Sequence, residues 1–264
     1  MYRQHFGLTS QPLGKDTQDL WDDGPITALK ERFTWLLENP GVAFLTGEAG
    51  VGKTAALRLI TDTLNPHRYQ VIYMAETDFG RMDIYRQLAV ALGLDPAFRR
   101  AQLWRDIKAR ITELADSKYI LPIWIIDEAQ NLPLEFFRDF PAFLNFAFDS
   151  RDLMTVWFVG QPSLAQIVTR APYAALASRV HLKMSFAPVM ERERFAQLVR
   201  HGLKTAGCKQ TIISDSGLEL LLQGSQGTPR KAGTILRTAM RLATLKGLSH
   251  LPDDLIKDAM EELK

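Results

Sequence analysis

The residues best suited to chemistry form one glycine-rich stretch in the first quarter of the chain. The stretch fits the spacing G-x-x-x-x-G-K-[ST] at every position, and its members are Gly47, Glu48, Ala49, Gly50, Val51, Gly52, Lys53 and Thr54. Its glycines let the backbone turn tightly, so that successive N–H groups point at phosphate oxygens. Lys53 supplies a positive charge for the β- and γ-phosphates, and the Thr54 hydroxyl suits a Mg²⁺ ligand. The stretch therefore predicts a site for a nucleoside triphosphate and Mg²⁺.

A pair of carboxylates forms a second candidate. Asp127 and Glu128 directly follow the apolar run 123–126. Ligands of open α/β sheets bind at the carboxyl ends of the strands, which is where this pair is expected to lie. We expect Asp127 to hold Mg²⁺, directly or through water, and Glu128 to orient and polarise the attacking water. Acidic residues also end strands at solvent for structural reasons, but the phosphate loop upstream favours catalysis.

Four further side chains are suited to phosphoryl chemistry. Gln161 follows the apolar run 154–160 and is placed to touch the γ-phosphate or the lytic water, although a helix cap is the alternative. Arg179 lies before the last apolar run and can supply a cation to the transition state in a neighbouring molecule, with Arg170 a weaker candidate. Arg230 opens a C-terminal helix, where a planar guanidinium can read the nucleotide bound by its own chain. Any single arginine can equally be a solvated surface residue.

The elements that must position these residues are read from the apolar periodicity. Strands are expected at about 42–46, 71–75, 120–126 and 154–160, with a last strand ending near 184. Helical stretches separate them, and this alternation predicts an α/β fold in which helices cover both faces of a parallel sheet. From about residue 190 the pattern is only helical, with helices expected at about 191–206, 215–223, 228–246 and 252–263.

This reading divides the chain into three segments. They are an irregular N-terminal segment, 1–24, an α/β core that carries the phosphate loop, 25–188, and a small helical lid, 189–264. Inside the core, the phenylalanines between 136 and 148 are expected to pack in the interior, with a partial role at a subunit interface as the alternative.

Composition excludes several classes of protein. Hydrophobic residues make up 46% of the chain, too many for a disordered protein. The single cysteine, Cys208, excludes a disulfide framework and a thiolate metal site and agrees with a cytoplasmic location. No apolar run approaches the roughly 18 residues of a membrane span, so no membrane contact is expected. The net charge is +2, but the stretches 195–214 and 220–252 contain no Asp or Glu, which makes the C-terminal third basic.

Taken together, the motifs resemble those of the AAA+ ATPases. The resemblance rests on the GEAGVGKT loop, the IIDEAQ strand end, Gln161, the arginine of SRV and the arginine of GTPRK. It implies a P-loop fold with a helical lid, Mg²⁺-dependent hydrolysis of ATP, an arginine finger at Arg179 and a second sensor at Arg230. Gln161 departs from the pattern, because many AAA+ proteins carry Asn there.

More narrowly, YRQHFGL at residues 2–8 and the run IIDEAQNLP resemble the ExeA/GspA-like ATPases and the transposition ATPases TnsC, TniB, IstB and MuB. ExeA-like ATPases continue into a membrane segment, and no such run occurs here, so we expect a transposition regulator. That resemblance implies a homo-oligomeric ring or helical filament on double-stranded DNA, which marks the target site and recruits the transposase. A secretion-associated ATPase that acts on a protein partner is the alternative, and a replication-loader or chaperone type is a third.

The resemblance also implies where DNA would lie. In the family, channel-facing loops and helix starts hold the DNA backbone without reading sequence. In this chain they correspond to the loop 77–81, which ends at Arg81, and to a basic run that begins with Arg99 and Arg100. Basic helix faces are often only solvated, and that alternative stays open for all three arginines.

Overall fold

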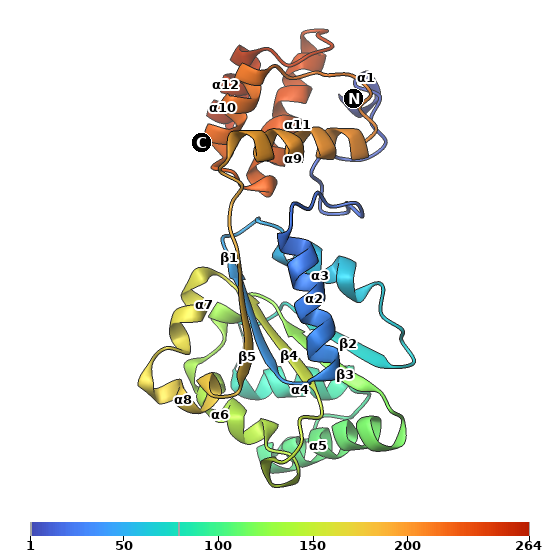
Figure 1. Cartoon of the computed structure of the whole chain (residues 1–264), viewed down its shortest axis with the longest axis vertical. Coiled ribbons are helices and arrows are strands. Elements are labelled where there is room, and N and C mark those ends of the chain that lie inside the picture. The colour runs from blue at the N-terminus through green and yellow to red at the C-terminus, as the bar shows by residue number, and fades with distance from the viewer. Residues whose placement is uncertain (1, 79, 264) are drawn as a thin grey trace. The chain divides into compact units, whose positions relative to one another are not determined.

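A parallel β-sheet organises the larger part of the structure, a computed structural model that describes residues 2–78 and 80–263 (Figure 1). The described chain folds as two units. The α/β unit comprises Thr27–Glu48 and Leu57–Phe186, and the helical unit comprises the segment up to Ile26, Ala49–Ala56 and the chain from Ala187 onward. The predicted division at 1–24, 25–188 and 189–264 stays a proposal.

The sheet of the α/β unit has five strands in the order β2-β3-β4-β1-β5, and every pairing is parallel. The strands are β1 (Val42–Gly47), β2 (Tyr69–Met74), β3 (Leu121–Ile126), β4 (Thr155–Gly160) and β5 (Val180–Phe186). β1 and β4 are buried along their whole length, as near-continuous apolar runs require, whereas β5 at the edge is half-buried at alternate positions. The predicted parallel α/β sheet is confirmed.

Helices cover both faces of this sheet. They are α2 (Pro25–Glu38), α3 (Lys53–Thr61), α4 (Arg81–Ala91), α5 (Arg100–Ser117), α6 (Leu134–Leu144), α7 (Pro162–Ile167) and α8 (Ala174–Ala177). On β4, Trp157 stacks on Phe33 of α2 with ring centroids 5.2 Å apart, whereas Phe158 contacts Phe137 and Phe140 of α6 at 5.6 and 5.3 Å. Successive side chains of a strand point to opposite faces, so α2 and α6 lie on opposite sides of the sheet.

The predicted phenylalanine cluster lies in the core of the α/β unit, with one exception. Phe136, Phe137, Phe140 and Phe143 are 0% exposed, and Phe146 is nearly so. The exception is the sixth phenylalanine, at position 148, whose ring is fully exposed on the 3₁₀ turn η2 (Ala147–Asp149). Core packing is therefore correct for the five residues from 136 to 146 and wrong for the sixth.

The helical unit contains the four predicted C-terminal helices. They are α9 (Arg192–Thr205), α10 (Asp215–Ser225), α11 (Pro229–Leu245) and α12 (Asp253–Glu262). The N-terminal segment belongs to this unit: Phe6 and Leu8 are buried in its core, and Arg237 Nη1 donates to the Pro12 carbonyl at 3.1 Å. A short helix, α1 (Tyr2–His5), replaces part of the irregular chain expected over 1–24. None of the helices in the described part of the chain combines the length and apolar character of a membrane span.

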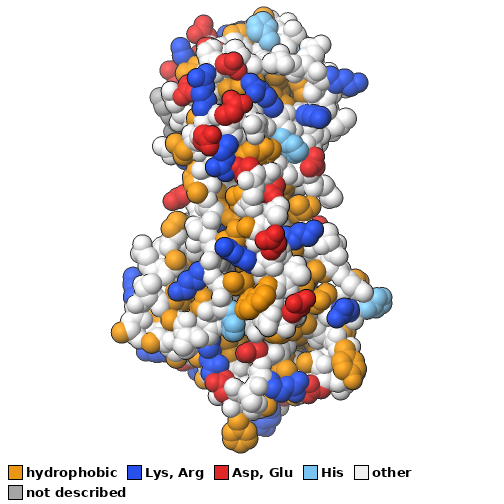
Figure 2. Space-filling view, in the orientation of Figure 1, with side chains coloured by type: hydrophobic (Ala, Val, Ile, Leu, Met, Phe, Trp, Pro, Cys, Tyr) orange, Lys and Arg blue, Asp and Glu red, His pale blue; other side chains and the backbone are white. Residues whose placement is uncertain are grey.

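The basic C-terminal third is partly neutralised by ion pairs. Arg241 Nη2 lies 2.5 Å from Glu262 Oε1, and Lys246 Nζ lies 3.7 Å from Asp258 Oδ2. The first pair joins α11 to α12, and the second joins the C-cap of α11 to α12, which carries acidic residues that the basic stretch lacks. On the face shown in Figure 2, basic and acidic side chains are interspersed over this unit. The asymmetry along the sequence is therefore reduced in three dimensions.

The core assignment gives a paired stability prediction. Phe140→Ala should lower the free energy of unfolding by about 3–5 kcal/mol, because the fully buried ring leaves a cavity. Phe148→Ala is the matched control and should change it by less than about 0.5 kcal/mol, since that ring is exposed. Urea titrations of both variants measure the difference. Equal losses would contradict the placement of α6 against the sheet.

Candidate nucleotide site

The carboxyl edge of the sheet brings together several residues that the sequence singled out. Parallel strands end at the same edge, and the pairings Thr46↔Gly160 and Ile126↔Phe158 put the ends of β1, β3 and β4 next to one another. The residues that follow these strand ends are the start of the glycine-rich stretch, the carboxylate pair and Gln161. Their proximity is a finding of the structure, and their chemical roles stay predictions.

Asp127 is held rigidly at this edge. Its side chain is buried; Oδ2 accepts a hydrogen bond from the Tyr73 hydroxyl at 3.0 Å, and Oδ1 accepts one from the Glu128 N–H at 2.9 Å. Burial, followed by the negative charge of Asp127, raises the pKa of Tyr73, so its hydroxyl keeps its proton and donates. A fixed carboxylate is the hard oxygen ligand that Mg²⁺ prefers, and the chemistry of this residue fits that ion.

Glu128 adopts an unusual backbone conformation. Its φ of 51° lies in the left-handed region, which costs a non-glycine residue about 1–3 kcal/mol. The Thr77 hydroxyl donates to the Glu128 carbonyl at 3.0 Å and helps to hold this turn. The side chain is exposed, and its Oε2 accepts a hydrogen bond from Gln130 Nε2 at 2.6 Å. The turn thus presents the carboxylate beyond the end of β3, as a general base requires.

Gln161 connects to the same group of residues through its backbone. Its N–H donates to Gln130 Oε1 at 3.0 Å, and its side chain is exposed. Gln161 also occupies the N-cap position of α7, in agreement with the alternative role as a helix cap. Its side chain, however, makes no capping hydrogen bond to the described residues of α7. The side chain therefore stays available for the predicted contact with phosphate or water.

The glycine-rich loop has the backbone that its sequence predicts. Gly50 has φ 87° and Gly52 has φ 101°, values that side chains on L-residues rarely tolerate. Helix α3 begins at Lys53, which is buried, and the next residue, Thr54, is exposed. A helix that begins directly after the loop directs its N-terminal N–H groups and its dipole toward a bound anion.

Arg230 lies against this loop within the helical unit. Its backbone N–H donates to the Gly50 carbonyl at 3.3 Å, and its side chain is exposed. A Cβ at Gly50 would lie 2.6 Å from the Arg230 Cβ, so glycine is required for this close approach. The structure thus brings together two parts of the predicted nucleotide site that are far apart in the sequence.

Arg179 is engaged inside its own chain. Its two terminal nitrogens donate to Asp149 Oδ1 and Oδ2 at 2.6 and 2.7 Å. The Asp149 carboxylate raises the pKa of Arg179, and the guanidinium in turn lowers the pKa of Asp149. A guanidinium that forms two parallel bonds to a carboxylate has the geometry that also binds phosphate. Arg170, the weaker candidate, is exposed.

Two of the three predicted DNA contacts converge on one carboxylate. Arg81 and Arg100 begin α4 and α5, and they lie 2.6 and 2.8 Å from Asp139 Oδ2 of α6. Arg100 also lies over the Trp104 ring, 4.3 Å from its centroid. Arg99 is exposed. One negative charge therefore faces two positive ones, and both arginines have a structural role besides any DNA contact. Phe79, in the preceding loop, lies outside the described residues.

The contacts of two further residues were not predicted from the sequence. Gln130 is the bridge described above, and its only sequence signal is a polar residue that closely follows the carboxylate pair in IIDEAQ. Phe98 is 87% exposed, and the Arg86 guanidinium lies 5.9 Å from its ring centroid. The only sequence signal for Phe98 is the FRR triplet at 98–100.

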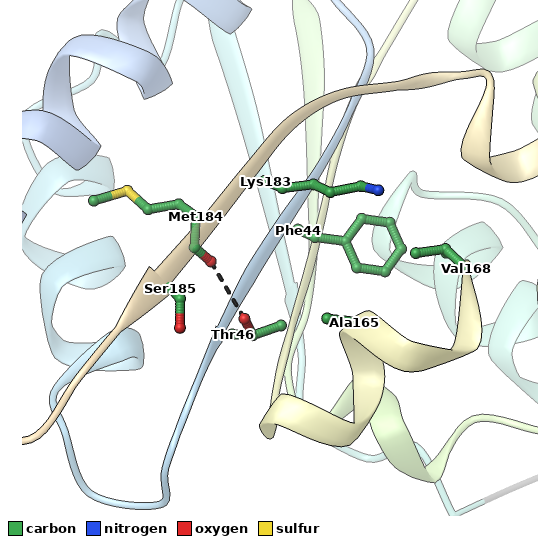
Figure 3. Close-up of a pocket in the computed structure, with 7 residues that line it drawn as sticks. All are labelled: Phe44, Thr46, Ala165, Val168, Lys183, Met184 and Ser185. Carbon is green, nitrogen blue, oxygen red and sulfur yellow. Dashed lines mark hydrogen bonds between the residues drawn. The ribbon is translucent and has the colours of Figure 1, made fainter.

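A separate cavity of about 240 Å³ lies between α7 and the β1–β5 edge of the sheet. In Figure 3 the Phe44 ring faces Val168, the Lys183 side chain extends above it, and the Thr46 hydroxyl donates to the Met184 carbonyl at 3.4 Å. Its lining contains none of the described site residues named above, and it consists of Phe44, Thr46, Ala165, Val168, Lys183, Met184 and Ser185.

The loop geometry predicts the effect of one methyl group. Gly50→Ala should raise the dissociation constant for a non-hydrolysable ATP analogue about tenfold or more, because it combines a positive φ with a contact of 2.6 Å to Arg230. Gly80→Ala is the control, since Gly80 has φ −61° and its added Cβ would meet only Asp83 Oδ2 at 3.3 Å. Calorimetry measures both variants, and equal affinities would contradict the assignment of this loop.

Two characterised proteins resemble most of the chain. General secretion pathway protein A of Aeromonas hydrophila is 27% identical over 253 residues, which cover 94% of this chain and 46% of that protein. The chain thus spans about half the length of that relative. ORC1-type DNA replication protein 1 of Halobacterium salinarum is 24% identical over 241 residues, 86% of this chain and 71% of that protein.

The fold is also found in a solved structure. The Aeropyrum pernix ORC1 protein in complex with DNA matches with a TM-score of 0.70 at 17% identity, over 95% of this chain and 68% of that one. A family model described as an AAA domain matches residues 37–168, half of the chain. This segment includes the glycine-rich loop, the carboxylate pair and the strand end before Gln161. The chain therefore belongs to the AAA domain family of nucleoside triphosphatases.

Proposed function

We propose that this protein is an ATP-dependent, DNA-binding AAA+ regulator of DNA transposition. It would oligomerise on double-stranded DNA, mark the target site and recruit or activate the transposase. The observation that carries the ATPase part is Glu128, which a strained turn holds next to the buried Asp127 at the carboxyl edge of the sheet. The transposition part is supported by the motif resemblance described above.

The residues divide the chemistry among them. Backbone N–H groups of the loop and Lys53 would bind the triphosphate, while Thr54 and Asp127 would hold Mg²⁺. When bound, Mg²⁺ would neutralise charge on the phosphates. Glu128 would accept a proton from the attacking water, and the exposed Gln161 amide would orient that water or the γ-phosphate. Arg230, which lies against the loop at Gly50, would couple the C-terminal helices to the nucleotide state.

DNA binding is supported by the arginines at the starts of α4 and α5. Arg81 and Arg100 share the single charge of Asp139, so positive charge remains for a phosphate. The exposed Arg99 lies at the N-cap of α5. Contacts of this kind give affinity that falls with salt and reads little sequence. The matched replication protein and the solved complex with DNA favour the same partner class.

Self-association is supported by Arg179. A finger acts on the phosphate of an adjacent subunit, so a ring or filament would complete each site. The bidentate pair with Asp149 keeps the guanidinium in a phosphate-binding geometry before a neighbour arrives.

A second candidate is a secretion-associated ATPase that acts on a protein partner. The likeness to General secretion pathway protein A, which extends over 94% of this chain, favours it. The two candidates share the ATPase chemistry and differ in the effector, so ATPase stimulation by duplex DNA distinguishes them.

The assigned roles predict opposite effects for two variants. Glu128→Gln should keep ATP binding and trap the DNA-bound assembly, because it removes the base without disturbing the loop. Lys53→Ala should abolish both ATP binding and assembly, because it removes the charge that holds the phosphates. Gel shifts and electron microscopy with duplex DNA and ATP would show this. An unchanged rate of ATP hydrolysis in Glu128→Gln would contradict the proposal, and so would a protein that stays monomeric in saturating ATP and DNA.

The DNA surface predicts a change in salt dependence. Arg99→Ala should weaken duplex binding about equally for all sequences and reduce the slope of log K against log salt by about one. Lys118→Ala, at the other end of the same helix, is the control and should leave that slope unchanged. Fluorescence anisotropy at several salt concentrations measures both. Equal slopes for the two variants would remove Arg99 from the interface.

A further inference from the structure

We propose that Gln130 is a positioning residue, which holds the Glu128 carboxylate and ties it to the tip of β4. This inference rests on the proposed ATPase function and adds a residue to it. Gln130 lies on η1 (Ala129–Asn131), the 3₁₀ turn that follows the carboxylate pair, and its side chain is half-buried.

Both ends of the Gln130 amide are engaged. Nε2 donates to Glu128 Oε2 at 2.6 Å, and Oε1 accepts from the Gln161 N–H at 3.0 Å. The two partners determine the orientation of the amide, because a carboxylate can only accept and a backbone N–H can only donate. A primary amide carries one donor end and one acceptor end at this spacing. Neither a carboxylate nor an apolar side chain of the same length can make both bonds.

The neighbouring strand end is built to admit this amide. A Cβ at Gly160 would lie 2.4 Å from Gln130 Oε1 and 3.4 Å from the Gln130 backbone nitrogen. Any other residue at position 160 would therefore displace the amide. The Gln130 bridge therefore depends on glycine at the end of β4.

The exposure of Glu128 explains what such a bridge would contribute. Its carboxylate follows a left-handed turn and is exposed, so without a partner the side chain would sample several rotamers. The hydrogen bond from Gln130 holds one carboxylate oxygen, Oε2. Because the carboxylate is rigid, this bond also restricts where its second oxygen can lie. A base that is held in place reacts more often from the productive geometry than one that rotates.

The bridge also connects two strand ends that are predicted to contact different parts of the reaction. Glu128 follows β3 and would take the proton of the water, while Gln161 follows β4 and would contact the γ-phosphate. A shift of the β4 tip on contact with phosphate would reach the Glu128 carboxylate through a single side chain. Gln130 thus links phosphate contact to the position of the base.

The test is a steady-state comparison of Gln130→Met and Gln130→Glu with the unmodified protein. Gln130→Met keeps the length and removes both bonds, so kcat should fall about 10–100-fold, the usual effect of losing a group that orients a catalytic one, with KM for ATP within about twofold. Gln130→Glu keeps the acceptor for Gln161 but sets a carboxylate against Glu128, and kcat should fall at least as far. Gly160→Ala should lower kcat in the same way without changing position 130.

A double-mutant cycle separates positioning from general damage. In a Glu128→Gln background, Gln130→Met should have little further effect, because the group that it positions is already inactive. A kcat that is unchanged or raised in Gln130→Met would overturn the inference, and so would an equal loss in both backgrounds. Failure of the proposed function looks different: the unmodified protein would not hydrolyse ATP, or Glu128→Gln would turn over at the normal rate, and both ideas would then fall.

Discussion

Parallel pairing of five strands is the constraint on which the rest of the α/β unit depends. It requires a helix or loop after each strand to return the chain to the other end of the sheet, and it brings the strand ends to one edge. Successive side chains along each strand then point to opposite faces of the sheet. Trp157 and Phe158 point to opposite helical layers, and the polar residues Asp127, Glu128 and Gln161 follow the strand ends. Polar chemistry can collect there because the carboxyl ends of the strands are where open α/β sheets bind their ligands.

Backbone strain occurs in several parts of the described chain, and one of them is the carboxyl edge of the sheet. Glu128 is held in the left-handed region by a bond from Thr77, and the glycines of the nucleotide loop adopt conformations that other residues avoid. A second strained run, Ala147, Phe148 and Asp149, presents the carboxylate that binds Arg179. Strained conformations persist only where neighbouring contacts hold them, and they cluster at sites that must present a group in a fixed direction.

Several arginines have partners inside the chain that imitate an anionic ligand. Asp149 engages Arg179 through two bonds, and Asp139 accepts from both Arg81 and Arg100. A carboxylate offers a guanidinium the same planar pair of oxygens as a phosphate does, so such pairs keep the arginine extended and preorganised. Exchange for a phosphate then costs less side-chain entropy than ordering a free arginine would.

The sequence by itself determined the elements and the chemistry carried by contiguous motifs. The strands, the four C-terminal helices and the glycine-rich loop follow from periodicity and local backbone requirements, which a short stretch contains in full. Only the tertiary structure decided the contacts between distant segments. These are the hydrogen bonds that link Glu128 through Gln130 to Gln161, the hydrogen bond from the Arg230 N–H to the Gly50 carbonyl, and the ion pair of Arg241 with Glu262. It also separated exposed Phe148 from its buried neighbours and folded the N-terminal segment onto the C-terminal helices. Such contacts depend on strand register and helix packing, and these are properties of the whole chain that no local pattern contains.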